Sequence, residues 1–477
     1  MRERIHTNVA QAFLIQLLQG LGQFQNVQDS LISACNHLKL TKDIAYPSAY
    51  LVPSLFRHPS APLFQIQPSV SKQCLKKTVD AAVTVAAIAL SWALPVQDFL
   101  LANRLVVQAW YRNVSTQTAT QTFPVLIVEI DQTSLERGNI QQRNPLDRQY
   151  LARLVEKLTA LEAKVIGIDY LLDREQPGDR FFSAAVQRSY VKGIHFVFVA
   201  DCPKDTYPRC ENWLRPTKNL NLPTGTALGD LRFLGNGQSA YYLPFWQADD
   251  WTIAPFAYKL AQSYTHMIQP QSPIRNPTQP DFLTRLGYGL GQMWLHPIVD
   301  FSLSPQSVYQ RIPAWQLLQS DANAPELRNL HQQVVMLVPG GYLEAGIRQA
   351  GEDNYPLPAA TQYWRQRAQP PDLRSQLIGS ELHAYLYHHF LNQRAITPIP
   401  DIWLVLLIIA GAKGTVWVIQ KRSPPRRQVL YLLVSGTLIY IVLSIQVYVS
   451  LAVIIPIILP LSLYWFYLTS TLLHHQP

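Results

Sequence analysis

The chain has 477 residues, of which 48% are hydrophobic and 15% charged, and its formal net charge is +9 at pH 7. An ordinary soluble protein has about 25% charged residues, so charge is depleted somewhere in this chain. The 11 Trp and 23 Tyr, with only 21 Gly and 4 Cys, exclude a wholly disordered chain, a collagen-like repeat and a disulfide-dense miniprotein.

The first part of the chain, residues 1–70, precedes any long apolar segment and is expected to be a small, partly helical region in the cytoplasm. An apolar segment follows at 79–102, interrupted by Asp80, Pro95 and Asp98. We predict that it is the first membrane span, with a buried core helix as the alternative. It begins too far from Met1 to be a cleaved signal peptide.

Residues 103–398 are expected to form an extracytoplasmic α/β domain with a mainly parallel sheet. The apolar run 124–131 is typical of a buried strand, residues at helical spacing follow over 146–158, and 163–169 reads as a second strand. This order predicts a right-handed βαβ unit with adjacent, parallel strands. Further strands are predicted at 194–199 and 334–338.

Two cysteines, Cys202 and Cys210, lie eight residues apart in the predicted outer domain, with two prolines between them that could turn the chain back. We predict a disulfide between them, because thiols oxidise outside the cytoplasm. Two free thiols are the alternative, and a mass shift on reduction and alkylation distinguishes the two states. Cys35 and Cys74 are expected on the cytoplasmic side, in reduced form.

The C-terminal part of the chain contains no Asp, Glu, Lys or Arg after Arg427. As one helix, the apolar residues of 430–473 would measure about 66 Å, twice the roughly 30 Å thickness of a hydrocarbon core. We therefore predict two spans, at 430–448 and 450–473, with the turn near 444–450. A further span is predicted at 402–420, which makes four in total.

Basic residues flank these spans unevenly, and cytoplasmic flanks carry the excess of Lys and Arg. The larger group consists of Lys72, Lys76, Lys77, Lys421, Arg422, Arg426 and Arg427, and the smaller one of Arg104, Arg112 and Arg394. The bias predicts a multi-pass protein of the plasma (inner) membrane with both termini in the cytoplasm. The membrane topology thus explains the basic loop 421–427 between the spans 402–420 and 430–448. We therefore expect no nucleic-acid partner.

Four stretches of the chain resemble the CHASE sensor domains of the second type, which are extracytoplasmic sensory modules of bacterial kinases, cyclases and related receptors. They are 125–135, 161–173, 338–358 and 380–385. The resemblance covers roughly 80–470 and implies one span before the outer domain and three after it. The stretch Gly-Glu-Asp-Asn-Tyr-Pro-Leu-Pro at 351–358 looks like the cyanobacterial version.

The N-terminal region is similar to the last part of a CHAT domain, a caspase-like module, in residues 1–4, 9–13 and 51–55. The resemblance implies that the catalytic His and Cys would precede the matching segment, so we expect no enzyme activity. His6 and Cys35 do not occupy the matching positions and are read as a surface and a core residue. We expect either that the chain has lost its effector domain or that Met1 is an internal Met of a longer protein.

The candidate ligand-binding residues are acidic. Asp131 and Asp169 end the two predicted strands, so their carboxylates could meet at the carboxyl edge of the sheet and hold a divalent cation or an amine. Alternatively, each caps the turn that follows it. Glu352 and Asp353 could join them, or could satisfy loop amides. No zinc-ligand spacing, Walker A loop or serine nucleophile elbow occurs, so no metal or cofactor is predicted.

These features favour a membrane-anchored receptor whose outer domain recognises an unidentified stimulus and transmits it through the membrane helices. The expected partners are the membrane, an extracytoplasmic ligand, and a cytoplasmic signalling protein or a second copy. A membrane scaffold without a small-molecule ligand is the alternative. A small transporter is a third hypothesis, suggested by Lys413, Pro456 and Pro460 within the spans.

Overall fold

The structure, a computed structural model, divides into two compact units, Met1–Ala86 and Ala87–Pro477. The residues it describes are 6–42, 45–46, 48–51, 53–55, 63–66, 70–115, 125–203, 210–235, 240–245, 252–268, 274, 279–321, 324, 327–340, 342, 353–422 and 425–474.

The first unit is a hairpin of two helices, α1 (Thr7–Gly22) and α2 (Val27–Lys42), followed by the short 3-10 helix η1 (Ala49–Leu51). The helices approach closely at Gly20, where an added Cβ would lie 2.8 Å from Ser30 Oγ. Val9, Ala34 and Leu38 are buried. The long helix α3 (Val70–Trp92) begins in this unit and ends in the second.

The second unit is built around a six-stranded sheet in which every pair of neighbouring strands is parallel. The strand order is β4-β3-β2-β8-β1-β7. The strands are β1 (Val125–Ile130), β2 (Val165–Ile168), β3 (His195–Ala200), β4 (Ala227–Asp230), β7 (Tyr309–Pro313) and β8 (Val334–Pro339). The expected α/β class with a mainly parallel sheet is confirmed.

The neighbour relation expected of β1 and β2 is wrong, because β8 lies between them. Val334 of β8 is in register with Val125 of β1 on one side and with Val165 of β2 on the other. A βαβ crossover sets the direction of its two strands but leaves room for a third strand between them. Here that strand comes from a segment much later in the chain.

Helices cover both faces of this sheet, which explains why its strands are apolar throughout. Leu126 and Val128 of β1 face a core shared with α6 (Arg148–Ala160), α7 (Asp179–Val191) and α11 (Ala314–Gln319). Val125 and Ile127 face the opposite core, which includes α8 (Phe256–Met267) and α13 (Gly379–Asn392).

Shorter elements complete the second unit. Two-stranded sheets are formed by β5 (Leu234–Gly235) with β6 (Tyr241–Tyr242), β9 (Asn354–Pro356) with β10 (Gln376–Ile378), and β11 (Thr397–Pro398) with β12 (Val453–Ile454). The short helices are α5 (Gln132–Arg137), η3 (Lys218–Leu220), α9 (Phe282–Gly289), α10 (Pro305–Val308), η5 (Leu330–Gln332) and α12 (Ala359–Arg365).

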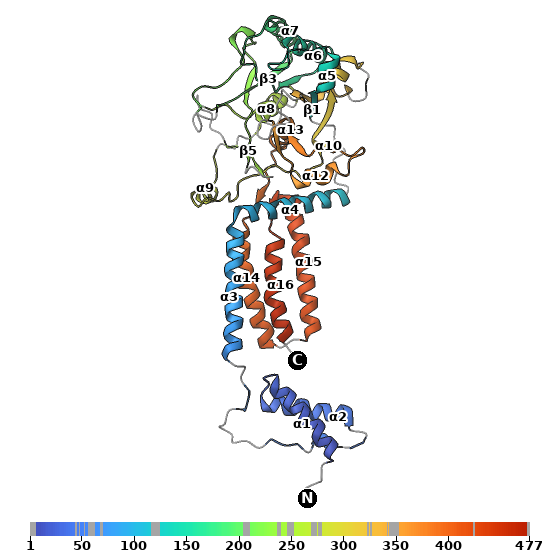
Figure 1. Cartoon of the computed structure of the whole chain (residues 1–477), viewed down its shortest axis with the longest axis vertical. Helices are drawn as coiled ribbons and strands as arrows, with labels where there is room; N and C mark the ends of the chain where they lie inside the picture. Colours follow the sequence, from blue (N-terminus) through green and yellow to red (C-terminus); the bar gives the residue numbers. More distant parts are fainter. Residues whose placement is uncertain are drawn as a thin grey trace. The chain divides into compact units, whose positions relative to one another are not determined.

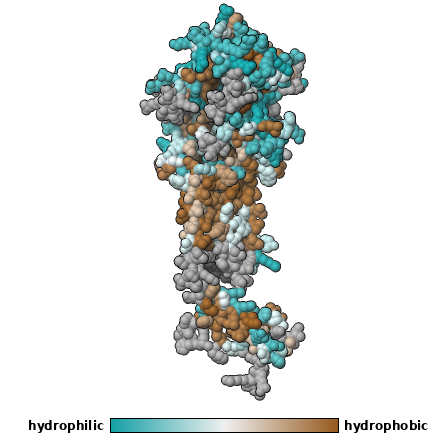
Figure 2. Space-filling model, viewed as in Figure 1, coloured by the Kyte–Doolittle hydropathy of each residue, from teal (hydrophilic) through white to brown (hydrophobic). Residues whose placement is uncertain are grey.

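Two helices of the described chain are long and apolar enough to cross a membrane, namely Asp401–Ile419 within α14 (Asp401–Arg422) and Arg427–Leu451 within α15 (Arg426–Leu451). Figure 2 shows apolar residues gathered over this part of the unit and hydrophilic residues over the sheet domain. In the last helix, α16 (Ile458–His474), the apolar part Ile458–Thr469 is shorter than a span.

The predicted boundaries of the spans differ from the observed helices in two places. The segment 79–102 is not one helix, because α3 ends at Trp92 and α4 (Leu94–Val114) continues at an angle of 77°. Figure 1 shows α4 running across the ends of α14 and α15. The turn expected near 444–450 lies later, where Ala452 adopts a positive φ of 56° and the chain continues into β12. The helix expected over 450–473 consequently begins only at Ile458.

Candidate functional site

The first of the predicted ligand residues, Asp131, caps a helix. Its Oδ1 accepts hydrogen bonds from the backbone N–H of Ser134 at 2.7 Å and from the Ser134 hydroxyl at 2.5 Å, at the start of α5. This is the alternative role considered for it, since an Asp at this position satisfies a free backbone donor of the helix. The separation of β1 from β2 by β8 removes the reason to pair Asp131 with Asp169.

Asp169 instead interacts electrostatically with Asp353. Asp169 follows β2, and its backbone N–H donates to the carbonyl of Leu337 in β8 at 2.9 Å. Asp353 precedes β9, and its carboxylate accepts a hydrogen bond from the backbone N–H of Gly379 at the start of α13. The two acids form what we call the acid pair.

The acid pair is held in a poorly solvated environment. Burial raises the pKa of Asp169, and burial together with the charge of Asp169 raises the pKa of Asp353. Among the described residues, no donor satisfies the buried Oδ2 of Asp353. Both effects favour a bound proton or cation at the pair over two free carboxylates. Glu352, the remaining predicted ligand residue, lies outside the described residues.

A metal site of the usual kind is not formed in the part of the chain that the structure describes, where no three His, Cys, Asp or Glu side chains lie close enough to hold an ion.

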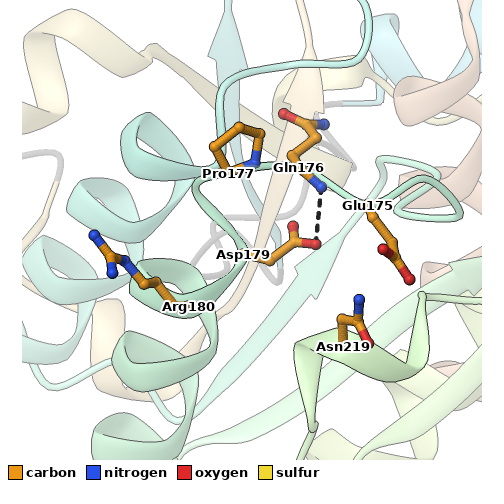
Figure 3. A pocket seen from close by; sticks show the side chains of 6 residues that line it. All are labelled: Glu175, Gln176, Pro177, Asp179, Arg180 and Asn219. Carbon is orange, nitrogen blue, oxygen red and sulfur yellow. Dashed lines mark hydrogen bonds between the residues drawn. The ribbon is translucent and has the colours of Figure 1, made fainter.

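A pocket of about 470 Å³ opens at the start of α7. Its lining residues, drawn in Figure 3, are Glu175, Gln176, Pro177, Asp179, Arg180 and Asn219.

The carboxylate of Asp179, which lines this pocket, accepts two hydrogen bonds from the protein itself. It accepts a hydrogen bond from the backbone N–H of Gln176 at 3.0 Å, the dashed line in Figure 3, and one from Arg148 Nε at 3.1 Å. Arg148 is itself almost completely buried. Since none of the predicted ligand residues lines this pocket, the acid pair and the pocket are separate features.

A second charged group, the Glu381 cluster, surrounds the N-terminal turn of α13. Glu381 is fully buried and accepts hydrogen bonds from the Tyr309 hydroxyl at 2.6 Å and from Arg365 Nη2 at 2.7 Å. Its Oε1 also accepts from Arg374 Nη2 at 3.1 Å. These contacts join α13 to β7, to α12 and to the loop before β10.

The Glu381 cluster extends to the sheet through Glu129 in β1. Arg311 Nη1 lies 3.5 Å from Glu129 Oε1, and Arg374 Nη1 lies 3.7 Å from the same oxygen. Burial raises the pKa of Glu129 to about 7, the charge of Arg311 acts in the opposite direction, and the charges of Glu381 and Asp131 add to the increase. Glu129 therefore changes its charge near neutral pH.

A third polar group, the Asp300 junction, connects the sheet domain to α4 and α15. The Tyr448 hydroxyl of α15 donates to Asp300 Oδ2, and Arg112 Nη2 of α4 donates to the same hydroxyl at 3.0 Å. The backbone N–H of Asp300 donates to His389 Nε2 at 2.6 Å. Five residues make up the junction: Arg112, Asp300, Ser302, His389 and Tyr448.

The electrostatics of the Asp300 junction favour a charged Asp300. Burial would raise its pKa, but the charge of Arg112 and the hydrogen bonds from Ser302 and Tyr448 outweigh burial, so the pKa of Asp300 is lowered. Burial lowers the pKa of His389, whose Nδ1 lies 2.7 Å from the carbonyl of Arg394. A neutral imidazole that donates through Nδ1 and accepts at Nε2 satisfies both contacts.

Further contacts join the sheet domain to α4, α14 and α15 near this junction. Arg104 of α4 pairs with Asp401, the first residue of α14, and both side chains are buried. Arg394 Nη2 donates to the carbonyls of Tyr448 and Val449 at 3.0 Å. The pairing of β11 with β12 joins the segment before α14 to the one after α15.

The helix α13 connects all three groups. Gly379 contacts Asp353 of the acid pair, Glu381 lies in the first turn of the helix, and His389 reaches the Asp300 junction from its last turn. A 14-residue helix is about 21 Å long. Nearly every residue of α13 is buried, so a displacement at one end cannot be absorbed locally by loose packing.

Several of these residues were not identified from the sequence. Glu129 interrupts an otherwise apolar strand, which was the one local sign of a special environment. Glu381 lay within a stretch noted only for its resemblance. The partners Asp300 and Tyr448 are 148 residues apart, and no local pattern relates them.

The predicted disulfide is present in the structure, where Cys202 and Cys210 are joined.

Comparison with known proteins gives one match. A family model described as the CHASE2 domain matches residues 81–417, which is more than half of the chain. No curated protein and no solved structure matches the chain.

Proposed function

Because the chain belongs to the CHASE2 domain family, we propose that it is a membrane-anchored receptor that senses a stimulus at the acid pair and transmits it through α13 to the membrane helices. The single observation that carries this proposal is the course of α13, which touches Asp353 at its first residue and Asp300 from its last turn. The two helices long enough to cross a membrane support the anchored location.

The proposed stimulus is a small cation or amine, or a proton, that neutralises the acid pair. Asp169 and Asp353 have raised pKa values, and one buried carboxylate oxygen of Asp353 has no donor among the described residues. A bound positive charge would remove the repulsion between the two carboxylates. Asp353 and Gly379 would then shift relative to Asp169, and α13 would move with them.

The proposed topology has four membrane-spanning segments, with residues 103–398 outside and both termini in the cytoplasm. It rests on the basic loop around Lys421 and Arg427. We propose further that residues 1–70 derive from a CHAT-like domain without protease activity. They would contact a cytoplasmic signalling partner or a second copy of the chain.

Binding is tested with the full-length protein in lipid nanodiscs, by thermal unfolding in the presence of divalent cations and small amines. A ligand that binds only the folded state raises the Tm. We expect at least one member of the panel to do so in a saturable manner, and Asp169→Asn with Asp353→Asn to abolish the increase. Asp147→Asn is the control, since Asn can replace the cap that Asp147 provides at the start of α6. If no member raises the Tm, the acid pair does not bind a cation or an amine of these classes.

Transmission is tested in the same preparation with spin labels at Lys421 and Thr469. Ile419 and Leu468, close to these positions, share one apolar cluster, so the labels lie near each other. A saturating ligand should change the dipolar broadening between the labels. Tyr448→Phe, which removes the hydroxyl from the Asp300 junction, should reduce that change, whereas the exposed Tyr431→Phe on the same helix should not.

A ligand that raises the Tm but leaves the broadening unchanged would contradict transmission and would leave a binding domain on a passive anchor. An equal effect of Tyr448→Phe and Tyr431→Phe would contradict the route through the Asp300 junction.

A further inference from the structure

The short helix α9 carries an exposed apolar face that no function described so far uses. Phe282, Leu283 and Leu286 of this helix and Leu290, directly after its last residue, are 69%, 41%, 45% and 46% exposed. At 100° per residue they fall within an arc of about 100° on one side of the helix. Thr284 and Gly287 lie on a different side and are buried against the domain. Arg285 points outside the apolar arc and is exposed.

The position of α9 is fixed by the segment that follows it. An added Cβ on Gly287 would lie 2.9 Å from Trp294 Cβ, so the helix rests directly on Trp294. The Trp294 ring makes edge contacts with Trp92 at 5.9 Å and with Trp403 at 5.8 Å between centroids. Trp92 is the last residue of α3, and Trp403 is the third residue of α14.

Hydrogen bonds hold the same segment to the corner between α3 and α4. Gln97 Nε2 donates to Gln292 Oε1 at 2.7 Å, and Gln292 Nε2 donates to the carbonyl of Trp92 at 3.2 Å. Figure 1 shows α9 level with α4 at the domain end of α14. Trp side chains are enriched at the membrane–water boundary. The three tryptophans therefore mark that boundary beside α9.

The helix α4 gives independent support for the level of the boundary. Its residues Arg104 and Arg112 contact the first residue of α14 and the last turn of α15, respectively. Contacts to the ends of two membrane helices from positions eight residues apart require α4 to run along the membrane surface. Its remaining face exposes Phe99, Trp110 and Val114.

We propose that α9 is a membrane-binding foot of the sheet domain, whose face of Phe282, Leu283, Leu286 and Leu290 inserts into the boundary between headgroups and acyl chains of the leaflet next to the domain. A short amphipathic helix with a Phe and Leu face suits that depth. The foot and α4 hold the domain at separate points of the lipid surface, and this inference does not depend on the receptor function.

The test uses the full-length protein with Cys35→Ser and Cys74→Ser, keeping the disulfide, in vesicles of phosphatidylcholine and phosphatidylglycerol. A nitroxide is attached at Leu286→Cys, and separately at Arg285→Cys and Val191→Cys as controls. Val191 is 83% exposed at the end of α7. Collision of the nitroxide with oxygen, which concentrates in the acyl region, is compared with collision with a water-soluble nickel complex.

We expect the ratio of oxygen to nickel collisions at Leu286 to be several-fold higher than at Arg285 and Val191. The same ratio at Phe282→Cys should also be high. A Leu286 label as accessible to nickel as the Val191 label would overturn the proposal, because the face would then lie in water. A Leu286 label shielded from both reagents would overturn it as well, because a second copy or another protein would then cover the face.

Discussion

The cap formed by Asp131 decides how that residue should respond to substitution. Asp131→Ala removes the acceptor for two donors of Ser134 and should lower the free energy of unfolding by about 1 kcal/mol. Asp131→Asn should keep most of the stability, because an Asn side chain also caps helices. Thermal unfolding of the two variants in nanodiscs measures the difference. Equal losses in both would point to a role for the negative charge.

The raised pKa of Glu129 makes the stability of the domain depend on pH. The folded protein holds the Glu129 proton up to about pH 7, whereas the ordinary value is 4.5. Between these values the folded state binds more protons than the unfolded state, so stability falls as pH rises. The contribution that is lost amounts to at most about 3 kcal/mol.

Glu129→Gln should remove this contribution. The Tm of the variant should therefore exceed that of the natural chain by more at pH 8 than at pH 5. Glu156→Gln serves as the control, because Glu156 is half-exposed on α6, where it pairs with Arg188. A pH-independent difference between Glu129→Gln and the natural chain would show that Glu129 is charged throughout, with Arg311 and Arg374 compensating it.

At the scale of elements, α8 lies unusually close to the sheet because two strands carry glycine beneath it. An added Cβ on Gly229 of β4 would clash with the backbone of Phe256, lying 2.9 Å from its N atom, and one on Gly167 of β2 would lie 2.8 Å from Leu260 Cδ2. The backbone cannot move away as a flexible side chain could. The approach of α8 thus depends on these two positions.

Gly229→Ala should consequently lower the free energy of unfolding by about 1–3 kcal/mol, the usual cost of overpacking, and lower the Tm. Gly289→Ala in α9 is the matched control, since nothing lies within 4 Å of its added Cβ, and Ala favours a helix over Gly. An unchanged Tm for Gly229→Ala would mean that α8 can move off the sheet without loss.

At the scale of the whole molecule, the proposed topology places the two ends of α14 on opposite sides of the bilayer. Cysteines introduced at Val191 and at Arg422, in the chain with Cys35→Ser and Cys74→Ser, are therefore expected to differ in their accessibility from outside the cell. In intact spheroplasts, a membrane-impermeant maleimide should label Val191→Cys, and should label Arg422→Cys only after permeabilisation. Labelling of Arg422→Cys alone in intact spheroplasts would reverse the proposed orientation.

The sequence by itself determined which segments form buried strands or apolar helices, because the hydropathy of consecutive residues decides whether a segment is buried or exposed to water. Apolar runs such as 125–130 and 334–339, buried on both faces, predict strands of a parallel sheet, because such a sheet is covered by helices on each side. The uncharged stretch after Arg427 likewise predicts membrane helices. These patterns depend on neighbouring residues only, so they are readable without knowledge of the fold.

Only the tertiary structure decided which distant segments meet. The insertion of β8 between β1 and β2, the meeting of Asp169 with Asp353, and the contact of Tyr448 with Asp300 each join residues more than a hundred positions apart. The break in the helix after Trp92 belongs here too, because α4 turns to reach the domain. Such contacts depend on the path of the chain through crossovers and spans, which local hydropathy does not encode.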